Sequence, residues 1–434
     1  MTPQSNFMIL APVNPQREGE LRHLLASMND APGRVRADNG LIPFGKFDGL
    51  HFARFVILDD QTLDDVGLHN GEPVPIYPLY LAFIGDIDGD ADAFLEELVT
   101  LAANGLRSIF SCCADFTADT DLAGWLRQHG TPPVAAYVNW PGRTVRRVRE
   151  EAALRIALES FVDGSSSTLR GMSPREIHSK LRRFINAEKS AGRITLSGDD
   201  STPPAWRIRN VLHLVGVPLL LLLALPLLIV IAPIVLVRLR QLEKTDPELT
   251  WRVNPAHSDG LARLEDHDVT NQFTAMGSLK PGVVRLLTVI GVLGTVDYAA
   301  RHIVRPGRLG RIRTIHFARW VFLDRRKRMV FFSNYDGTVD SYMDDFINKT
   351  GFGLNAVFSN GIGYPRTNWL VRDGCADEQK YKEFLRRHTL PTQVWYKAYP
   401  GLTAIDLERN GRIRQGLESS SMGEQETREW IALL

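Results

Sequence analysis

The sequence has few cysteines, almost no net charge and none of the short motifs that mark common enzyme classes. Its three cysteines, Cys112, Cys113 and Cys375, are too few for a disulfide framework, and two are adjacent, so we expect a reducing compartment. Lys and Arg number 51 against 50 Asp and Glu. Because this balance gives no overall attraction to phosphate, we predict no nucleic-acid partner.

The motifs that are missing narrow the chemistry further. No CxxC pair, HExxH, P-loop, GxSxG or dinucleotide-binding fingerprint is present, which disfavours zinc hydrolases, nucleotide enzymes and serine hydrolases. No metal-ligand set can be assigned. The N-terminal segment has no basic region and only a short apolar run, so it predicts a first strand and no secretion signal. We expect the bulk of the chain on the cytoplasmic side.

One long apolar run does stand out. Residues 211–237, VLHLVGVPLLLLLALPLLIVIAPIVLV, contain no charged residue and only one polar side chain, His213. The run exceeds the roughly 20 residues that span a bilayer, so it predicts membrane association with the lipid bilayer as partner. Pro218, Pro226 and Pro233 interrupt it, and arginines flank it on both sides.

Three arrangements are compatible with this run. A re-entrant hairpin that turns near Pro226, or a monotopic insertion, would keep both basic flanks on the cytoplasmic face. A single span would place the two halves of the chain on opposite sides, and a buried core helix would need no membrane. We favour the hairpin or monotopic insertion, because the two halves look like partners that pack together.

The partnership is inferred from an internal repeat. LHFARFVILDD (residues 50–60) returns as IHFARWVFLDR (315–325), and FIGDIDGDADAFLEEL (83–98) returns as FFSNYDGTVDSYMDDF (331–346). WLRQHGTPPVAAYVNWPGRT (125–144) aligns without a gap on FLRRHTLPTQVWYKAYPGLT (384–403). Each copy has the predicted order βαββαβ, which is that of a ferredoxin-like plait.

We therefore predict an α+β fold of two tandem ferredoxin-like βαββαβ plaits packed as a pseudo-dimer, with a helical membrane-inserting segment between them. The expected boundaries are 1–158 for the first repeat, 159–270 for the insertion with its apolar segment 211–237, 271–418 for the second repeat, and 419–434 for a C-terminal tail.

Two repeated residue pairs are candidates for chemistry. His51 and His316 lie on strands among apolar neighbours, where each could ligate haem iron, act as an acid or base, or be a hydrogen-bonded core histidine. Arg54 and Arg319 lie on the same strands and need a counter-charge if buried. That partner is either a ligand carboxylate or haem propionate, or an internal acid such as Asp88 or Asp336.

Asp88 and Asp336, each followed by glycine, come after a strand and before a helix. This position predicts a helix N-cap with a turn glycine. His129 and His388 come at the other end of helices, where a cation would favour the C-terminal dipole and cap the last carbonyls.

The repeat and one short motif resemble a known superfamily. The sequence Gly85-Asp86-Ile87-Asp88-Gly89 fits the GxxDG signature of the dye-decolourising haem peroxidases, which are tandem members of the dimeric α+β barrel superfamily. In that signature the aspartate assists peroxide cleavage. The resemblance implies haem as a cofactor and Asp88 as a residue of its pocket.

Some features occur in the second copy alone. SNGIGYPRTNWLVRDG (residues 359–374) contains Tyr364, Arg366 and Trp369, where the first copy has the plainer SCCADFTADTD. The first helix of the second copy, residues 283–300, is also far more apolar. An apolar wall beside a polar, aromatic loop is typical of a small-molecule pocket, and equally of a helix on a bilayer.

These patterns lead to two functional hypotheses. The first is a membrane-attached protein that binds an apolar or lipid-derived small molecule or haem between the repeats, with peroxidase-type oxidoreductase chemistry if it is an enzyme. Its catalytic candidates are His316, Arg319 and Asp336, and its ligand-binding candidates are His51, Arg54, Asp88, Tyr364, Arg366 and Trp369. The second is a non-catalytic membrane-associated scaffold. The sequence predicts no oligomeric state.

Overall fold

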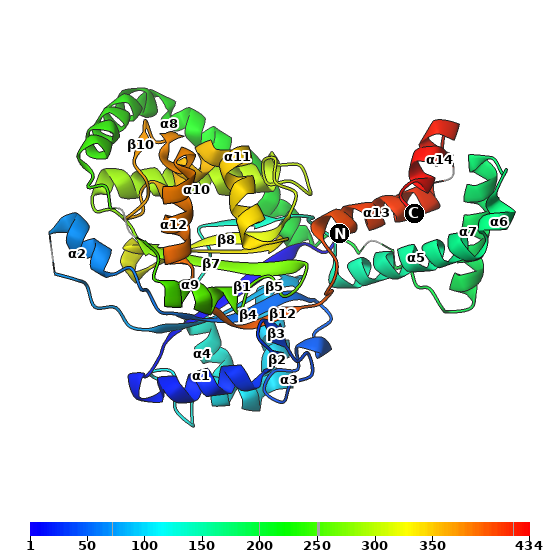
Figure 1. The fold of residues 1–434 in the computed structure, drawn as a ribbon, viewed down its shortest axis with the longest axis horizontal. Coiled ribbons are helices and arrows are strands. Elements are labelled where there is room, and N and C mark those ends of the chain that lie inside the picture. The colour runs from blue at the N-terminus through cyan, green and yellow to red at the C-terminus, as the bar shows by residue number, and fades with distance from the viewer. Residues whose placement is uncertain (72, 199, 250–251, 420) are drawn as a thin grey trace.

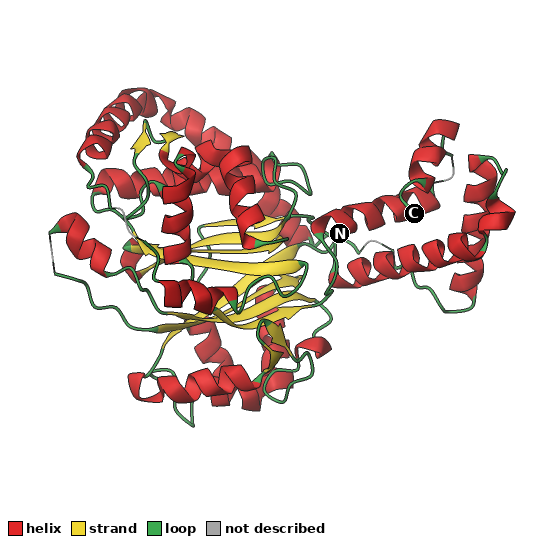
Figure 2. Ribbon diagram, in the orientation of Figure 1, coloured by secondary structure: helices red, strands yellow, loops and turns green. Residues whose placement is uncertain are grey.

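The computed structural model describes residues 1–71, 73–198, 200–249, 252–419 and 421–434. It is a mixed α+β structure around two four-stranded antiparallel sheets that face each other (Figures 1 and 2). Sheet one has the order β1-β5-β4-β12 and sheet two the order β6-β8-β9-β7. Their strands are β1 (Gln4–Pro12), β4 (Leu50–Leu58), β5 (Tyr80–Asp88), β6 (Ala135–Val138), β7 (Thr270–Ser278), β8 (Ile315–Leu323), β9 (Arg328–Asp336) and β12 (Thr392–Lys397).

Each sheet takes its fourth strand from the other half of the chain. β12 pairs with β4, with Tyr396 opposite Ala53, and β6 pairs with β8, with Tyr137 opposite Ala318. The segments that lead into these strands start on the opposite sheet, where Gly130 bridges to β1 and Thr389 bridges to β7. The two sheets are therefore joined at both edges, an exchange that the sequence repeat does not predict.

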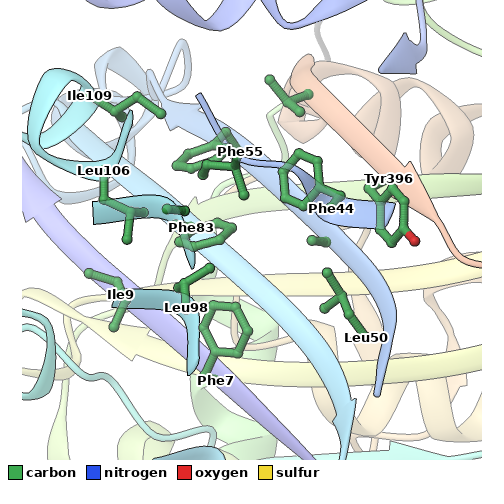
Figure 3. Packing of buried hydrophobic residues seen from close by; sticks show 14 of the residues in the cluster. Phe7, Ile9, Phe44, Leu50, Phe55, Phe83, Leu98, Leu106, Ile109 and Tyr396 are labelled. Atoms are coloured by element: carbon green, nitrogen blue, oxygen red, sulfur yellow. The ribbon is translucent and has the colours of Figure 1, made fainter. Parts of the chain in front are cut away.

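Apolar side chains fill three layers. One layer lies between the sheets and includes Val56, Val321 and Phe332. A second lies under sheet one, where Phe55 and Phe83 stack with ring centroids 4.2 Å apart (Figure 3). The third lies between sheet two and its helices. β4 and β9 are covered on both faces, and all of their residues are buried, including polar and charged ones such as Arg54 and Asn334.

Helices cover the outer faces of both sheets (Figure 1). Those by sheet one are α1 (Glu18–Ser27), α3 (Ala91–Phe110) and α4 (Leu122–Gln128), and those by sheet two are α10 (Val283–His302), α11 (Val339–Phe358) and α12 (Glu378–His388). The remaining short elements are α2 (Asp64–Asn70), α9 (Pro255–Ala262), the ribbons β2 (Asn29–Ala31) with β3 (Arg34–Val35) and β10 (Thr367–Asn368) with β11 (Arg372–Asp373), and 3-10 turns at Pro15–Arg17, Phe44–Lys46, Asp324–Arg326 and Gly374–Ala376.

A helical extension projects from the sheets (Figure 1). It consists of α5 (Val145–Gly164), α6 (Ser166–Leu169), α7 (Pro174–Ser190), α13 (Ala404–Glu418) and α14 (Glu424–Ile431). α5 and α13 follow the exchanged strands and are N-capped by the corresponding residues Thr144 and Thr403. The C-terminal segment packs here, because the Trp430 indole donates to the Ile413 carbonyl at 2.9 Å.

The apolar run lies in α8 (Pro204–Thr245), which is one continuous helix. The expected hairpin with a turn near Pro226 is therefore wrong. Each of the three internal prolines removes one backbone donor and tilts the next turn, which bends the helix without ending it. The buried core helix is also wrong, because none of the most apolar stretch of α8 is buried.

Candidate functional site

The two ends of the apolar run rest on the same helix, α10. Near the start of α8, His213 Nδ1 lies 2.8 Å from His302 Nε2, and the Tyr298 hydroxyl donates to the Leu214 carbonyl at 3.0 Å. Just after its end, Asp246 Oδ2 accepts from Arg285 at 2.5 Å. The first contacts lie at the C-terminal end of α10 and the last near its N-terminal end, so the two helices run antiparallel.

These two attachments force α8 to bow. At about 1.5 Å per residue, the stretch from residue 213 to 246 would be about 50 Å long if straight, whereas residues 285 to 302 of α10 span only about 25 Å. The excess length arches away from the body, as the curved α8 in Figure 1 shows. We call residues 211–237 the arc. The attachment at His213 and Leu214 is the first foot, and the attachment at Asp246, beyond the end of the arc, is the second foot.

The arc is apolar on every side. The four successive residues Leu220, Leu221, Leu222 and Leu223 lie about 100° apart around the helix, and each is more than half exposed. A surface helix of a soluble domain has one apolar stripe, whereas a helix that is apolar all round is typical of a membrane segment or of a deeply buried core. By length and composition, α8 and α10 are the two described helices that could cross a membrane.

The second foot is held by the loop that occurs in the second copy alone. The buried Glu243 carboxylate accepts from the Thr367 hydroxyl at 2.8 Å and from the backbone N–H groups of Trp369 at 3.0 Å and Leu370 at 2.6 Å. Trp369 and Leu370 have positive φ angles of 54° and 67°. Side chains disfavour that conformation, so the loop is strained in order to direct its N–H groups at Glu243.

The other predicted residues of this loop also serve the fold. Arg366 donates to the Asp246 carbonyl at 2.8 Å, and the buried Tyr364 hydroxyl donates to Asn355 Oδ1 at 2.8 Å. Burial raises the pKa of Tyr364 well above its usual value. The Trp369 side chain is half exposed. The structure therefore places Arg366 and Trp369 at the end of α8 and Tyr364 against α11, and none of their hydrogen bonds involves the repeated histidines.

Three basic side chains lie close to the Asp246 carboxylate at the second foot. Lys280 donates to Asp246 Oδ2 at 2.9 Å, and His69 Nε2 of α2 lies 3.7 Å from Oδ1. Burial alone would raise the pKa of Asp246, but the His69 imidazole and the charges of Lys280 and Arg285 outweigh it and hold this pKa well below its usual range. Burial lowers the pKa of Lys280 to about 8, against the opposing effect of Asp246.

The repeated histidines form two corresponding His–Asp units. His51 Nε2 lies 3.0 Å from Asp88 Oδ1, and His316 Nε2 lies 2.7 Å from Asp336 Oδ1. Both histidines are almost fully buried, and they line the same small cavity together with Tyr399. Of the predicted catalytic residues, the structure thus brings His316 and Asp336 into contact.

The sequence suggested that the two aspartates cap the helices that follow them, but they do not. α3 is capped by Asp90 and α11 by Thr338. Asp88 Oδ2 instead accepts from the N–H of Val145 at the start of α5, and Asp336 Oδ2 accepts from that of Ala404 at the start of α13. The turn glycines Gly89 and Gly337 do have positive φ angles, of 83° and 89°. The correction arises because the tertiary fold brings distant helix starts to these carboxylates.

The repeated arginines point between the two sheets, each into the opposite one. Arg54 donates to the carbonyls of Phe273 and Ser333, both at 3.0 Å, and to Asn334 Oδ1. Arg319 donates to the corresponding atoms of sheet one, the carbonyls of Phe7 and Gly85 and the carboxylate of Asp86. The internal partner is therefore Asp86, and the suggestion of Asp88 or Asp336 is wrong. Each of those two acids faces its histidine instead.

Burial dominates the chemistry of this cluster. It lowers the pKa of the Arg54 guanidinium to about 9, although Asp86 acts in the opposite direction. Arg319, with its pKa also lowered by burial, pairs directly with Asp86. Because each guanidinium group is hydrogen-bonded to the opposite sheet, the two arginines bind the halves together.

Several residues of the feet and the cavity escaped the sequence reading. Glu243 and Asp246 lie in a charged segment after the run, and, apart from Arg240 beside Glu243, their side-chain partners are more than 30 residues away. Their burial gives no signal in a sequence of alternating charges. Asn139 precedes the turn Trp140-Pro141-Gly142, and the second copy has Ala398 at the corresponding position. This polar residue in one copy alone was a signal that the sequence did offer.

No protein-family model, curated protein or solved structure matches the chain. Within the described residues, no group of three or more His, Cys, Asp or Glu side chains could hold a metal ion. The described cysteines are free and buried.

The residues that suggested haem do not fit it. Both Nε2 atoms are held by carboxylates, and His51 Nδ1 lies 2.9 Å from the Tyr399 hydroxyl. The cavity between the histidines leaves about 20 Å³ for water-sized groups, which is room for one or two waters. A porphyrin would require the two sheets to part.

Proposed function

We propose that this is a membrane-attached protein whose arc inserts into one leaflet and returns to the same side, so that the rest of the chain is held on the bilayer surface. The observation that carries the proposal is the position of the feet. Both rest on α10, so a membrane that takes up the arc leaves its two ends on one face. We infer that this is the cytoplasmic face, where the basic flanks favour it.

The free energy of apolar surface supports insertion over exposure to water. Transfer of apolar area out of water contributes roughly 25 cal/mol per Å², so an arc with large aliphatic side chains on every side is strongly unfavourable in solution. α10 adds to the apolar surface next to it, since Val283 and Leu287, one turn apart, are 72% and 57% exposed. A lipid-derived ligand would reach the protein along this surface.

We also propose that the two halves are tandem ferredoxin-like repeats related to the dimeric α+β barrel superfamily. The sequence repeat supports this, as do the corresponding contacts of Arg54 with Arg319 and of His51 with His316. Haem binding is not part of the proposal. The non-catalytic scaffold is the second candidate, and it is favoured by the repeated arginines, whose partners are groups of the chain.

Membrane insertion can be tested with purified full-length protein and lipid vesicles. We expect the wild type to float with the vesicles and to resist extraction at high pH. Changing Leu219, Leu223 and Leu227 together to Asp should abolish flotation, because each buried charge costs several kcal/mol in a bilayer. Ile76→Asp is the control, since Ile76 is 97% exposed but lies outside the arc.

The re-entrant path needs a separate measurement. Single cysteines in place of Arg207 and Lys244 flank the arc, and both should react with an impermeant maleimide from the same side of sealed membrane vesicles. Reaction from opposite sides would show a single span and overturn the proposed path. The native cysteines are buried and should label slowly.

A further inference from the structure

The two His–Asp units differ at one atom. His51 Nδ1 is 2.9 Å from the Tyr399 hydroxyl, whereas no hydrogen-bond partner of His316 Nδ1 is found among the described residues. The sequence explains the difference, because Trp140 of the first copy stands where the second copy has Tyr399. An indole has only an N–H donor and cannot reproduce the bond of a hydroxyl.

Two further polar groups near His316 also lack a partner. Asn139 is almost fully buried, and its Nδ2 atom makes no hydrogen bond within the described structure, while its Oδ1 atom accepts from the Tyr137 hydroxyl at 3.0 Å. The buried Nε1 atom of Trp140 is likewise without a partner there. Buried donors without partners are costly, so this concentration points to a missing acceptor.

These groups surround a defined space. Asn139, Trp140, Arg143 and His316 all line the cavity of about 20 Å³, which has room for one or two water-sized groups. Trp140 and Arg143 also line a larger open groove of about 600 Å³ between α5 and α13. The groove is lined by Arg147, Arg412 and Arg414 and by Glu408 and Glu418. Arg147 pairs with Glu151 and Arg414 with Glu418. The cavity is therefore the inner neighbour of a polar, arginine-lined groove.

The chemistry of the cavity selects its ligand. Asp336 accepts from His316 Nε2, which leaves Nδ1 to accept a proton and then to donate it, with the imidazolium charge balanced by Asp336. Asn139 supplies a second donor. We propose that the cavity binds the carboxylate group of a small organic acid, with one oxygen on His316 Nδ1–H and the other on Asn139 Nδ2. The rest of the acid extends past Trp140 and Arg143 into the groove.

This site does not depend on membrane insertion, and acetate can probe it directly. In detergent-solubilised full-length protein labelled with ¹⁵N-histidine, acetate should shift the Nδ1 resonance of His316 saturably. His51 is the internal control, because Tyr399 occupies its Nδ1, and its resonance should stay unchanged. Equal shifts of both histidines, or no saturable shift of His316, would overturn the proposal.

Variants separate binding from folding. His316→Gln and Asn139→Asp should each weaken acetate binding at least about tenfold, since each removes a charge-assisted or neutral donor. Asn139→Asp keeps the size of the side chain and adds a repelling charge, so it remains informative if a larger change unfolds the protein. His178→Gln, on the distant helix α7, should bind acetate like the wild type. Unchanged affinity in Asn139→Asp, with native near-ultraviolet circular dichroism, would also overturn the proposal.

Discussion

Two buried guanidinium groups lie near one carboxylate in the layer between the sheets. Arg54 and Arg319 are each 3% exposed, and Asp86 is bonded to Arg319 and raises the pKa of Arg54 through its charge. Asn334, which corresponds to Asp86 in the other half, donates to Asp86 Oδ2 at 2.9 Å. The second half thus offers an amide where the first offers a charge, and the cluster keeps an excess positive charge in a region that water does not reach.

Asp86→Asn should therefore lower the free energy of unfolding by about 3–5 kcal/mol, because it leaves two buried cations without an anion. Urea unfolding followed by circular dichroism measures this change. The control is Asp38→Asn at an exposed position, which should change stability by less than about 0.5 kcal/mol. An equal, small effect of both variants would show that the cluster contributes little.

His388 gives the molecule a pH dependence of known sign. Burial lowers its pKa to about 4, whereas an unfolded histidine titrates near 6.5. Between these values the unfolded chain binds more protons, so the free energy of unfolding falls as pH falls, by up to about 3 kcal/mol. His388 therefore does not act at the end of α12 as the cation that the sequence suggested. Its neutral ring contacts the Phe384 carbonyl at 2.8 Å.

The measurement is urea unfolding at pH 7, 6, 5 and 4. His388→Gln should lose most of the slope that the wild type shows below pH 6.5. His129→Gln, the same change at the corresponding position of the first copy, should keep it. A wild-type slope that His388→Gln leaves intact would assign the pH dependence to other groups.

The prolines of α8 allow a helix of this length to bend, so that both of its ends contact α10. A straight helix of this length would hold its ends about 50 Å apart, far beyond the distance between the contacts on α10. Pro218, Pro226 and Pro233 divide the helix into shorter stiff pieces with kinks between them. The bend lets Tyr298 and Arg285 hold opposite ends at once.

Changing the three prolines together to Ala should straighten α8 and detach at least one foot. Spin labels at Arg209, before the first attachment, and at Lys244, within the second, would report the change by electron–electron distance measurement. The wild-type separation should be near 30 Å, and that of the variant should lengthen toward about 50 Å. An unchanged distance would mean that the feet, and not the prolines, bend the helix.

The sequence predicted the positions of individual strands better than the contacts between segments that are far apart in the chain. Strands such as β4 and β8 were predicted within a few residues, because both are rich in β-branched and aromatic residues and contain only one histidine and one arginine each. Side chains alternate along β8 as the strand geometry requires, because Val321 and Leu323 belong to the layer between the sheets and Ala318 and Trp320 to the layer under the helices. The arginine partners and the feet could not be predicted, because each contact joins segments far apart in the chain.

For the whole molecule, strand exchange makes the halves interdependent. β4 has β12 at its edge, and β8 has β6 at its edge, so neither half alone completes a sheet. Without β12, the edge of β4 would expose a row of backbone donors and acceptors on a largely apolar strand, which favours aggregation. Folding stability should therefore be a property of the full chain.

Fragments 1–198 and 200–434 test this. Expressed separately, each should be insoluble or should lack cooperative unfolding, while co-expressed fragments should copurify and give the circular dichroism of the intact protein. Affinity capture through a tag on one fragment provides the measurement. A monomeric fragment 1–198 with cooperative unfolding would contradict the dependence.

Exchange also sets an order of events during synthesis. β6 leaves the ribosome about 180 residues before its partner β8, a delay of roughly 10–40 s at about 5–20 residues per second. The arc is made within that interval. If the arc inserts into the bilayer as soon as it emerges, the nascent chain is attached to the membrane before β8 is available to pair with β6. Sheet two is then completed beside the lipid, and the membrane becomes the place where the protein folds.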